Sequence, residues 1–279
     1  MNAMKQYTIT DGFVSAVILP EKGATAVSLQ KDGTEFLYRW EENLNSSERP
    51  RCGIPFLFPT FGRMEAETYR IDGKSYHMPI HGFGHTSPWT VESHREDTLV
   101  LTLTNCDAIA HMYPFAFQVR LTYRIESGAL VITQEYENLD TVPMPYAFGF
   151  HPYFLLDRLE NARVEAHADV RIDFARGEMI PFGSGTLSLE EPANAPEAGS
   201  ALAGLKSPTV LEIPAEHRRI TMEFTPDFPQ LVLWHPKDAR FLCVEPINGS
   251  PNGFNTGNHL TLQPGEKKAV TLTVRPEII

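Results

Sequence analysis

The stretch AFQVRLTYRIESGALVITQEYENL, from Ala116 to Leu139, decides the fold class of this sequence. Apolar and polar residues alternate along both of its halves, which is the pattern of strands that bury one face. Ser127 and Gly128 lie between the halves, and both residue types favour a tight turn. We therefore predict that the two halves form neighbouring antiparallel strands.

Other parts of the chain repeat this pattern. Thr98–Asn105 and Arg219–Thr225 alternate or are rich in β-branched residues. No segment shows three or more turns of clean helical periodicity, and the 22 prolines and 19 glycines fit many short strands joined by turns. The sequence thus predicts an all-β protein, a large antiparallel β-sandwich of roughly 15–20 strands, since so many strands do not lie flat in one twisted sheet.

Two further turns are predicted from local residue types. In Tyr69–Met78, the pair Asp72 and Gly73 can adopt the positive φ angles of a type I′ hairpin turn. In the stretch LTLQPGEKKAVTLTV, Pro264 and Gly265 serve the same purpose between two alternating runs. We expect a hairpin at each place.

One segment, Gly177–Ser207, breaks the strand pattern because it is rich in Gly, Pro, Ala, Ser and Glu. It could be a linker that divides the chain. We favour a long surface excursion within a single domain, residues 1–279, because strands of the same style continue on both sides.

Composition narrows the classes of function. A formal net charge of −11 argues against a nucleic-acid surface, which needs clustered Lys and Arg. Cys52, Cys106 and Cys243 are widely spaced and odd in number, which does not suit a disulfide framework and fits a reducing compartment. No signal peptide and no apolar run of the roughly 18 residues of a membrane span are visible, so we expect a soluble, cytoplasmic protein.

Two ionisable residues lie inside apolar runs. His151 lies in AFGFHPYFLL, a run that is otherwise aromatic, aliphatic, glycine and proline, and it is either a core histidine with one partner or a proton carrier on an apolar wall. Glu245 ends the run FLCV, and it is either solvated at a strand end or a partly desolvated carboxylate that faces a site. The residue pattern alone leaves both alternatives open.

Three histidines, His77, His81 and His85, are spaced four residues apart. This spacing provides metal ligands mainly on a helix, and the proline and glycines between them prevent a helix, so we predict no metal site. Gly82 and Gly84 indicate instead a backbone that bends sharply or lets a ligand approach. His81 is then a candidate polar contact in a cleft.

Arg63, Trp234 and His235 are ambiguous in a similar way. Arg63 follows a long apolar run and either ends a strand in solvent or holds a hydroxyl, carboxylate or phosphate. There is no Ser-His-Asp order, no G-x-S-x-G and no phosphate-binding glycine loop. The remaining set, a His and a Glu in apolar strands with a second His and an Arg, suits general acid–base chemistry without a cofactor.

Five motifs occur in a fixed order: CGIPFLFPTFGRM, IDGKSYHMPIHGFGH, AFGFHPYF, CVEPINGSPNGF and LQPGEKKAVTLTV. In this order they resemble the aldose 1-epimerase (galactose mutarotase) family, and most closely its branch of hexose-6-phosphate mutarotases and epimerase-like proteins. The likeness runs from Thr8 to Pro276. It implies a β-sandwich of the galactose mutarotase type that binds a monosaccharide or a sugar phosphate in an open cleft.

Members of this family interconvert the α and β anomers of an aldose by opening and reclosing the hemiacetal ring. The family's general acid falls on His151, which would give a proton to the ring oxygen, and its general base falls on Glu245, which would take one from the C1 hydroxyl. Because a nearby carboxylate raises the pKa of a histidine, we expect His151 to stay protonated. The substrate-binding residues that we expect are Arg63, His81, His85, Trp234 and His235.

The sequence departs from both branches of the family. The sugar-phosphate mutarotases carry H-G-F-A-R, whereas this chain reads HGFGH, with His85 in place of the arginine. Classical galactose mutarotases carry Asn before their arginine, whereas Gly62 precedes Arg63 here. Together with the negative charge, the missing arginine favours a non-phosphorylated sugar, although Arg51 or Arg63 could contact a phosphate.

Two other functions stay open at this point. The first is a sugar-binding or regulatory protein that keeps the cleft with little turnover. The second is a different isomerisation or a lyase step that uses the same acid–base pair. The presence of both His151 and Glu245 favours the mutarotase, while the sugar and the oligomeric state are left open by the sequence.

Overall fold

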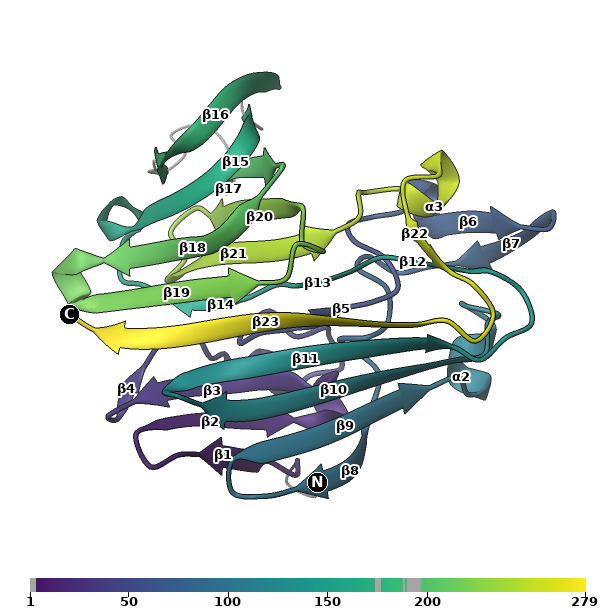
Figure 1. Ribbon diagram of the computed structural model, residues 1–279, viewed down its shortest axis with the longest axis horizontal. Coiled ribbons are helices and arrows are strands. Elements are labelled where there is room, and N and C mark those ends of the chain that lie inside the picture. The colour runs from purple at the N-terminus through teal and green to yellow at the C-terminus, as the bar shows by residue number, and fades with distance from the viewer. Residues whose placement is uncertain (1–3, 174–176, 188, 190–196) are drawn as a thin grey trace.

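The computed structural model describes residues 4–173, 177–187, 189 and 197–279 (Figure 1). These residues form two main sheets and two small ones, and all pairs of named strands are antiparallel. The first sheet contains, in order, β1 (Tyr7–Thr10), β2 (Val14–Leu19), β3 (Thr25–Lys31) and β4 (Thr34–Glu35). The small sheets pair β6 (Thr68–Ile71) with β7 (Lys74–His77) and β12 (Met144–Tyr146) with β22 (Leu260–Leu262).

The second main sheet has 15 strands. Its order is β5 (Phe56–Leu57), β13 (Phe148–Phe150), β21 (Phe241–Asn248), β20 (Gln230–Pro236), β17 (Glu197–Ala203), β15 (Arg163–Asp173), β18 (Lys206–Ile213), β19 (Arg218–Phe224), β23 (Lys267–Ile278), β11 (Ala129–Asn138), β10 (Phe117–Glu126), β9 (Thr98–Thr104) and β8 (Thr90–His94). Off this path, β14 (Tyr153–Leu155) pairs with β21, and β16 (Glu178–Leu187) pairs with β15.

Helices are few and short. The α-helices are α1 (Glu41–Leu44), α2 (Asp107–Ala110) and α3 (Gly253–Thr256), and the 3-10 helices are η1 (Pro20–Lys22), η2 (Glu65–Glu67), η3 (Leu159–Asn161) and η4 (Pro214–Glu216). Within the described residues, no helix has both the length and the apolar character needed to cross a membrane. The all-β fold class predicted from the sequence is confirmed.

The hairpin predicted from Ala116–Leu139 is present as β10 and β11. Its turn residues have positive φ angles, 51° for Ser127 and 72° for Gly128. The turn at Asp72 and Gly73 follows the same rule, with φ angles of 49° and 77°, and it joins β6 to β7. In both hairpins, the residue types at the turn and the strand patterns on either side were sufficient to predict the structure.

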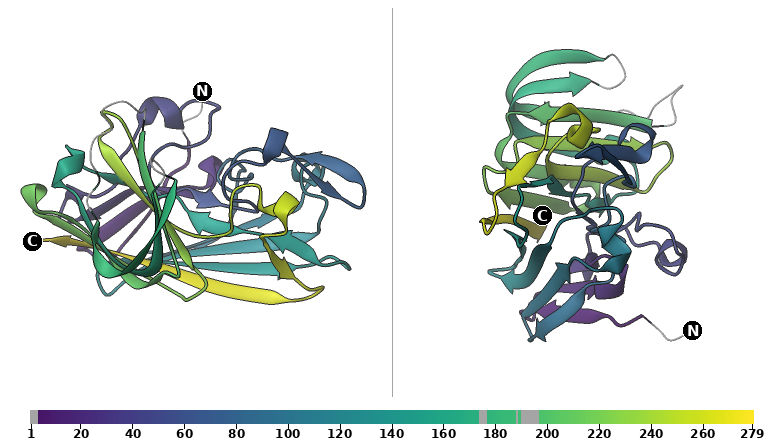
Figure 2. Two further views of the ribbon diagram at one scale, coloured as in Figure 1. Left: turned by 90° about the horizontal axis from the view of Figure 1, so that it is seen from above. Right: turned by 90° about the vertical axis from the view of Figure 1, so that its right-hand side faces the viewer.

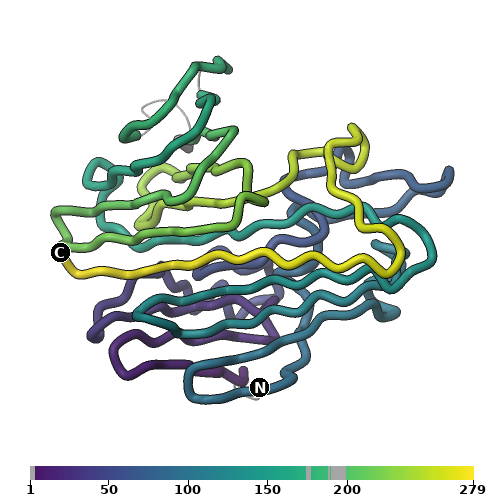
Figure 3. The backbone as a smooth tube through the Cα atoms, viewed as in Figure 1, coloured from purple at the N-terminus to yellow at the C-terminus, as the bar shows by residue number. Residues whose placement is uncertain are grey.

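The third predicted hairpin is wrong. Gly265 does lie in a turn, in which the N–H of Glu266 donates to the carbonyl of Gln263 at 2.9 Å. The strands on either side part after this turn, because β22 pairs with β12 while β23 pairs with β11 and β19. In Figure 3, the C-terminal strand β23, drawn in yellow, runs along the length of the molecule and does not fold back onto β22 as a hairpin.

The expectation of a long surface excursion between Gly177 and Ser207 is also wrong for its described part. β16, β17 and the start of β18 lie there, and β17 joins β15 to β20 within the main sheet. β16 pairs only with β15 and exposes most of its residues, which explains a composition poor in large apolar side chains. Residues 188 and 190–196 lie outside the described residues.

The core forms where the two main sheets face each other. In Figure 1, β2 and β3 lie behind β10 and β11, and the views in Figure 2 show the same two layers from other sides. Leu121 and Ile132 of the hairpin and Leu29 of β3 are fully buried in this core. The hydroxyl of Tyr123 donates to the carbonyl of Ala24 at 2.7 Å, which ties the two layers together. The sandwich is thus held by apolar burial with few internal polar links.

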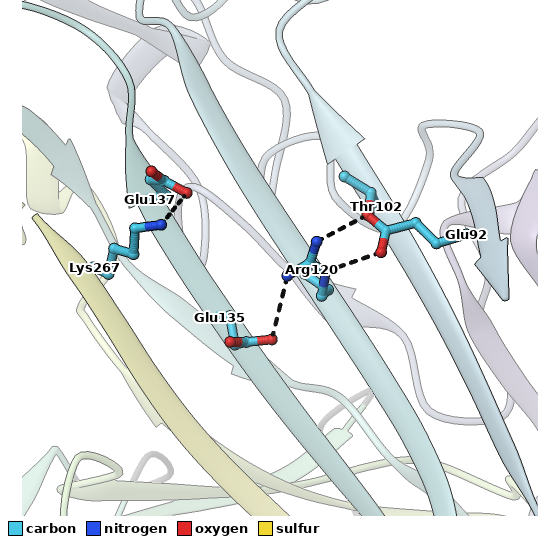
Figure 4. A network of polar contacts seen from close by, with 6 residues as sticks. All are labelled: Glu92, Thr102, Arg120, Glu135, Glu137 and Lys267. Carbon is cyan, nitrogen blue, oxygen red and sulfur yellow. Dashed lines mark hydrogen bonds and ion pairs between the residues drawn. The ribbon is translucent and has the colours of Figure 1, made fainter. Parts of the chain in front are cut away.

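The opposite face of the β8–β11 region carries a network of charged residues (Figure 4). Arg120 Nε lies 3.0 Å from a carboxylate oxygen of Glu92 and Arg120 Nη1 lies 4.0 Å from one of Glu135. Beside them, Lys267 Nζ lies 3.0 Å from Glu137. These residues form a solvated polar face, which leaves the other face of the strands for the core.

Candidate active site

An open cleft of about 780 Å³ lies at the other end of the main sheet, over β13, β14, β20 and β21. It contains aromatic side chains, four arginines, two histidines and one buried carboxylate. The lining residues are Tyr38, Trp40, Arg49, Arg51, Phe61, Arg63, Ile80, His81, His151, Tyr153, Val232, Trp234, Pro236, Asp238, Ala239, Arg240, Phe241 and Glu245.

His151 and Glu245 meet because of strand register. His151 lies between β13 and β14, which both pair with β21, and β21 carries Glu245. Pro152 has no N–H and interrupts the ladder at this point. The two pairings share one register, so His151 lies opposite Glu245 and both side chains point to the same face. The pairs that fix this register are Gly149 with Ile247 and Tyr153 with Cys243.

The two side chains form a buried pair. His151 Nε2 lies 3.4 Å from Glu245 Oε1, and the residues are only 7% and 2% exposed. Burial lowers the pKa of His151 to about 3, and the nearby Arg49 and His85 add to this lowering. Burial also raises the pKa of Glu245 well above its usual range, against the attraction of Arg49. The environment therefore disfavours the charged form of each group.

The directions of these two shifts favour a neutral pair in the free protein, a carboxylic acid on Glu245 and an uncharged imidazole on His151, so one acidic proton is shared between the two groups. The expectation that the carboxylate would keep His151 protonated is wrong for this state. A contact of 3.4 Å is longer than a normal hydrogen bond, so it does not compensate for the hydration that both groups lose on burial.

His81 lies beside this pair. It lines the cleft, and its ring centroid is 5.5 Å from that of His151, at an angle of 87° between the rings. Its Nδ1 accepts a hydrogen bond from the N–H of Gly62 at 3.2 Å, and burial lowers its pKa well below the usual value. A neutral His81 whose Nδ1 accepts must carry its proton on Nε2, which makes that atom a hydrogen-bond donor.

The bend that places His81 depends on two glycines. A Cβ on Gly82 would lie 2.3 Å from the carbonyl oxygen of Phe58, and one on Gly84 would lie 3.1 Å from a side-chain atom of the same residue. The N–H groups of Phe83 and Gly84 both donate to this carbonyl at 2.9 Å. The missing side chains of Gly82 and Gly84 therefore make room for Phe58 and not for a ligand. The sharp bend that the sequence indicated is present.

Aromatic rings surround the acid–base pair. Tyr153 stacks on His151 with ring centroids 4.7 Å apart and an interplanar angle of 12°. Trp234 also lines the cleft, with its ring 6.0 Å from that of His151. Phe150, in contrast, is fully buried in the core. The cleft thus has an apolar wall beside one imidazole, and Trp234 is part of that wall.

Two predicted substrate contacts lie elsewhere. His235 is fully buried, and its Nδ1 lies 2.7 Å from the carbonyl oxygen of Phe241. Val232 and Trp234 of β20 face the cleft, so the alternation of a strand turns His235 to the other face. The prediction that His235 binds substrate is therefore wrong for this arrangement.

His85 also lies outside the main cleft. It is 2% exposed and sits behind His81, with the ring centroids 6.2 Å apart. It lines a smaller hollow of about 280 Å³, whose walls it shares with Arg49 and Arg51. Among the residues that the structure describes, neither of its ring nitrogens has a hydrogen-bond partner, and burial lowers its pKa to about 3. His85, which we expected to bind substrate, is thus a neutral side chain that lines a side pocket and does not line the main cleft.

The cleft has a cationic rim. Two of its arginines, Arg63 and Arg240, form ion pairs with nearby carboxylates. Arg49 and Arg51 form no ion pair within the described part of the chain. Asn43 fixes the backbone of both, because its side chain accepts from the N–H of Arg51 at 2.7 Å and donates to the carbonyl of Arg49 at 3.1 Å. Two cations are therefore available to a ligand.

Two residues at the cleft were not predicted from the sequence, namely Arg49, which lines it, and Cys243, which lies beside the acid–base pair. Cys243 lies two residues before Glu245 in one strand, and the period of two already places them on one face. Their donor atoms and that of His151 all lie within 4.8 Å of one another, so these three described residues could hold a metal ion. For Arg49, the only signal was a pair of arginines around Pro50 in an acidic chain.

Comparisons with known proteins show which sequences and folds this chain resembles. The chain is 26% identical to the Slr1438 protein of Synechocystis sp. PCC 6803, with a TM-score of 0.90 over 100% of this chain and 97% of that one. A galactose mutarotase-like protein of Lactobacillus casei shares the fold, with a TM-score of 0.82, 22% identity, and coverage of 98% and 100%. The uncharacterized protein YphB of Escherichia coli is 24% identical over 79% of this chain and 82% of its own length.

The family assignment follows from the sequence as a whole. A family model described as aldose 1-epimerase matches residues 5–275, which is nearly the full chain. The antiparallel sheets, the open cleft over β21 and the fold of the solved relatives agree with that match. The chain belongs to the aldose 1-epimerase family.

Proposed function

We propose that the protein is a mutarotase, an isomerase that interconverts the α and β anomers of an aldose without a cofactor. The observation that carries this proposal is the buried pair of His151 and Glu245, with Nε2 and Oε1 3.4 Å apart on the wall of an open cleft. The volume of about 780 Å³ lies within the usual range for small-molecule sites and accommodates a hexose.

Ring opening needs two proton transfers. One group takes the proton of the C1 hydroxyl, and another gives a proton to the ring oxygen O5 as the C1–O5 bond breaks. We assign the first to Glu245 and the second to His151. Rotation about the C1–C2 bond then presents the other face of the aldehyde, and the two transfers run in reverse to close the ring. Each positioned transfer contributes about 10²–10⁴-fold to the rate.

The single proton of the pair is sufficient for this cycle. When sugar hydroxyls donate to the Glu245 carboxylate, they stabilise its ionised form, and the proton moves to His151. Ring opening returns the pair to a neutral imidazole and a carboxylic acid, because Glu245 gains a proton and His151 loses one. Burial favours this same neutral form in the free protein, so the site is matched to the open-chain intermediate.

The pair also supports an enzyme over a protein that only binds sugar. A buried acid–base pair without further hydrogen bonds costs stability, and binding a neutral sugar does not need it. His151 Nδ1 is buried without a partner as well. Because these features lower the stability of the protein, proton transfer to and from a substrate explains their presence better than sugar binding alone.

Exchange NMR on a panel of aldoses tests the proposal. The rate of α-to-β exchange is measured with and without the protein for neutral hexoses, pentoses, hexose 6-phosphates and hexuronates. We expect catalytic acceleration for at least one sugar. Spontaneous rates for every member of the panel would contradict the mutarotase and leave the sugar-binding protein, which binding calorimetry on the same panel would then detect.

A second candidate function concerns the class of sugar. Arg49 and Arg51 lie at the cleft and form no ion pair with any residue that the structure describes, and partial burial of the Arg49 charge lowers the pKa of its guanidinium. An anionic group on the substrate would compensate for this loss of hydration. These arginines favour a mutarotase for an acidic sugar, either a phosphate ester or a uronate. Of the two, only the uronate is a non-phosphorylated sugar, the kind that the sequence favoured.

The variant Arg49→Met tests this candidate. It keeps much of the side-chain volume and removes the charge. For an acidic sugar we expect kcat/KM to fall by about 10- to 100-fold, the range of a hydrogen bond to a charged group. The corresponding neutral hexose should change much less. An equal fall for both sugars would contradict a role in charge recognition, and comparison of the 6-phosphate with the uronate identifies the anion.

A further inference from the structure

Cys243 lies beside the acid–base pair but has no part in the proposed proton transfers. It is fully buried on β21, two residues before Glu245. Its cross-strand partners are Tyr153 on β14 and Trp234 on β20, and both line the cleft. The thiol therefore lies on the cleft face of the sheet, directly under the floor of the site.

The donor atoms of His151, Cys243 and Glu245 all lie within 4.8 Å of one another. From this juxtaposition we propose that these three side chains form a binding site for a divalent transition-metal ion, zinc above all. The site would hold the ion through an imidazole nitrogen, a thiolate and a carboxylate oxygen. Nothing in the proposed anomer exchange requires such an ion.

The donor types select the class of metal. Thiolate and imidazole are preferred ligands of zinc, whereas magnesium and calcium take oxygen ligands. The spacing also fits, because zinc–ligand bonds of ~2.0–2.3 Å place two donors on one ion no more than ~4.6 Å apart. An upper limit of 4.8 Å between the donors thus needs only a small closing of the side chains.

The surroundings leave room for a fourth ligand. His151 and Glu245 both line the cleft, so an ion held between them faces open space that water can fill. Three protein ligands with one open position are the arrangement of zinc ions that exchange ligands. A thiolate and a carboxylate together carry two negative charges, which a divalent ion neutralises. On binding, the proton of the Cys243 thiol and the proton of the Glu245 carboxyl both leave to solvent. Arg49 opposes the ion, so we expect reversible binding.

Metal binding has a functional consequence that rests on the proposed function. An ion on His151 Nε2 and on the Glu245 carboxylate occupies the atoms to which we assign the two proton transfers. Zinc would therefore block anomer exchange, and a chelator would restore it. The binding itself rests only on the geometry of the three side chains.

Cobalt(II) titration of the purified, reduced protein in chelator-free buffer tests the site without any assay of activity. Thiolate ligation gives a sulfur-to-cobalt charge-transfer band in the near ultraviolet. We expect this band to saturate near one equivalent of cobalt and to disappear when zinc is added. It should be lost in both Cys243→Ser and Cys243→Ala and kept in the control Cys106→Ser, which removes an exposed thiol.

Zinc competition gives the size of the effect. Loss of an outer-shell partner lowers metal affinity by about 10–100-fold, so loss of the thiolate ligand should lower it by at least that factor. If anomer exchange is detected, Cys243→Ser should be correspondingly less sensitive to zinc, relative to its own rate without zinc.

Absence of a cobalt band in the unmodified protein would overturn the proposal. A band that persists in both Cys243 variants, or one that disappears with Cys106→Ser, would overturn it too. The spectroscopic result is independent of the proposed function, because it decides the metal site even if no sugar shows accelerated exchange.

Discussion

A comparison of two regions of this molecule shows what access to water does to a glutamate beside a cationic or basic partner. On the outer face of the sheet, Arg120 lies 3.0 Å from Glu92 and 4.0 Å from Glu135, and the side chains are 34–49% exposed (Figure 4). At the cleft, His151 lies 3.4 Å from Glu245, and both are less than 10% exposed.

Solvent changes the chemistry of these similar pairs. The hydrogen bond from Thr102 and the neighbouring Arg120 hold the pKa of Glu92 below its usual value, so it stays ionised. Burial has the opposite effect on Glu245 and raises its pKa. The exposed pair keeps its charges in place, whereas the buried pair shares one proton between two groups of shifted pKa, which is the property that acid–base catalysis needs.

The largest expected effect comes from removing the imidazole of the buried pair. We expect His151→Asn to lower kcat for anomer exchange by about 10²–10⁴-fold, because one positioned proton transfer is lost. The fold should survive, which circular dichroism and thermal unfolding can check. The control is His111→Asn at an exposed histidine. Full activity in His151→Asn would show that His151 is not the acid.

A smaller effect is expected from the neighbouring donor. His81 has a φ of 64°, which Asn tolerates, so His81→Asn should keep the bend. Loss of one hydrogen bond to the sugar should raise KM by about 10-fold, which corresponds to ~1.4 kcal/mol, and leave kcat nearly unchanged. Steady-state kinetics on the preferred sugar measure both constants. A fall in kcat with an unchanged KM would instead make His81 part of the proton transfers.

Burial of a neutral histidine should also appear in acid stability. His85 titrates at a pKa of about 3 in the folded protein, against about 6.5 in an unfolded chain. Between these values the unfolded chain binds more protons, so stability falls as the pH drops from 6.5 toward 3. We expect His85→Asn to lower the proton uptake on unfolding at pH 5 by about one. Urea unfolding at several pH values measures it.

The same exposed substitution, His111→Asn, is the control for this measurement. An identical pH dependence of the unfolding free energy in His85→Asn and in the unmodified protein would contradict the neutral, buried state of His85.

The smallest effect is expected on the outer face. Arg120→Met removes the centre of the network in Figure 4, and exposed ion pairs contribute about 0–1 kcal/mol. We therefore expect the free energy of unfolding to change by less than ~1 kcal/mol and anomer exchange to keep its rate. Denaturant unfolding with and without added salt is the measurement. A loss of several kcal/mol would show that exposed charges matter here as much as buried ones.

Local signals in the sequence predicted the fold well. The alternation in β10 and β11 and the positive φ angles of Ser127 and Gly128 depend only on neighbouring residues, so they could be predicted directly. At Pro264 and Gly265 the turn was predicted correctly, but the pairing of the strands on either side of it was not. Which strands pair is decided by contacts distant in sequence, and no local pattern contains that information.

The site was predictable in part. The motifs identified His151 and Glu245, but their meeting depends on the register of β13 and β14 against β21. The alternation of side chains along a strand already indicated that Trp234 and His235 face opposite sides of the sheet, so the two residues could not both face the cleft. The protonation state was not predictable, since the pKa values follow from the degree of burial, which only the folded arrangement provides.

One measurement tests the central claim most directly, namely that water exclusion makes the cleft glutamate catalytic. Exchange NMR on the preferred sugar compares Glu245→Gln with Glu135→Gln, the same substitution at the buried and at the exposed pair. We predict a loss of about 10²–10⁴-fold in the first variant and an unchanged rate in the second. Equal rates in the two variants would contradict the account.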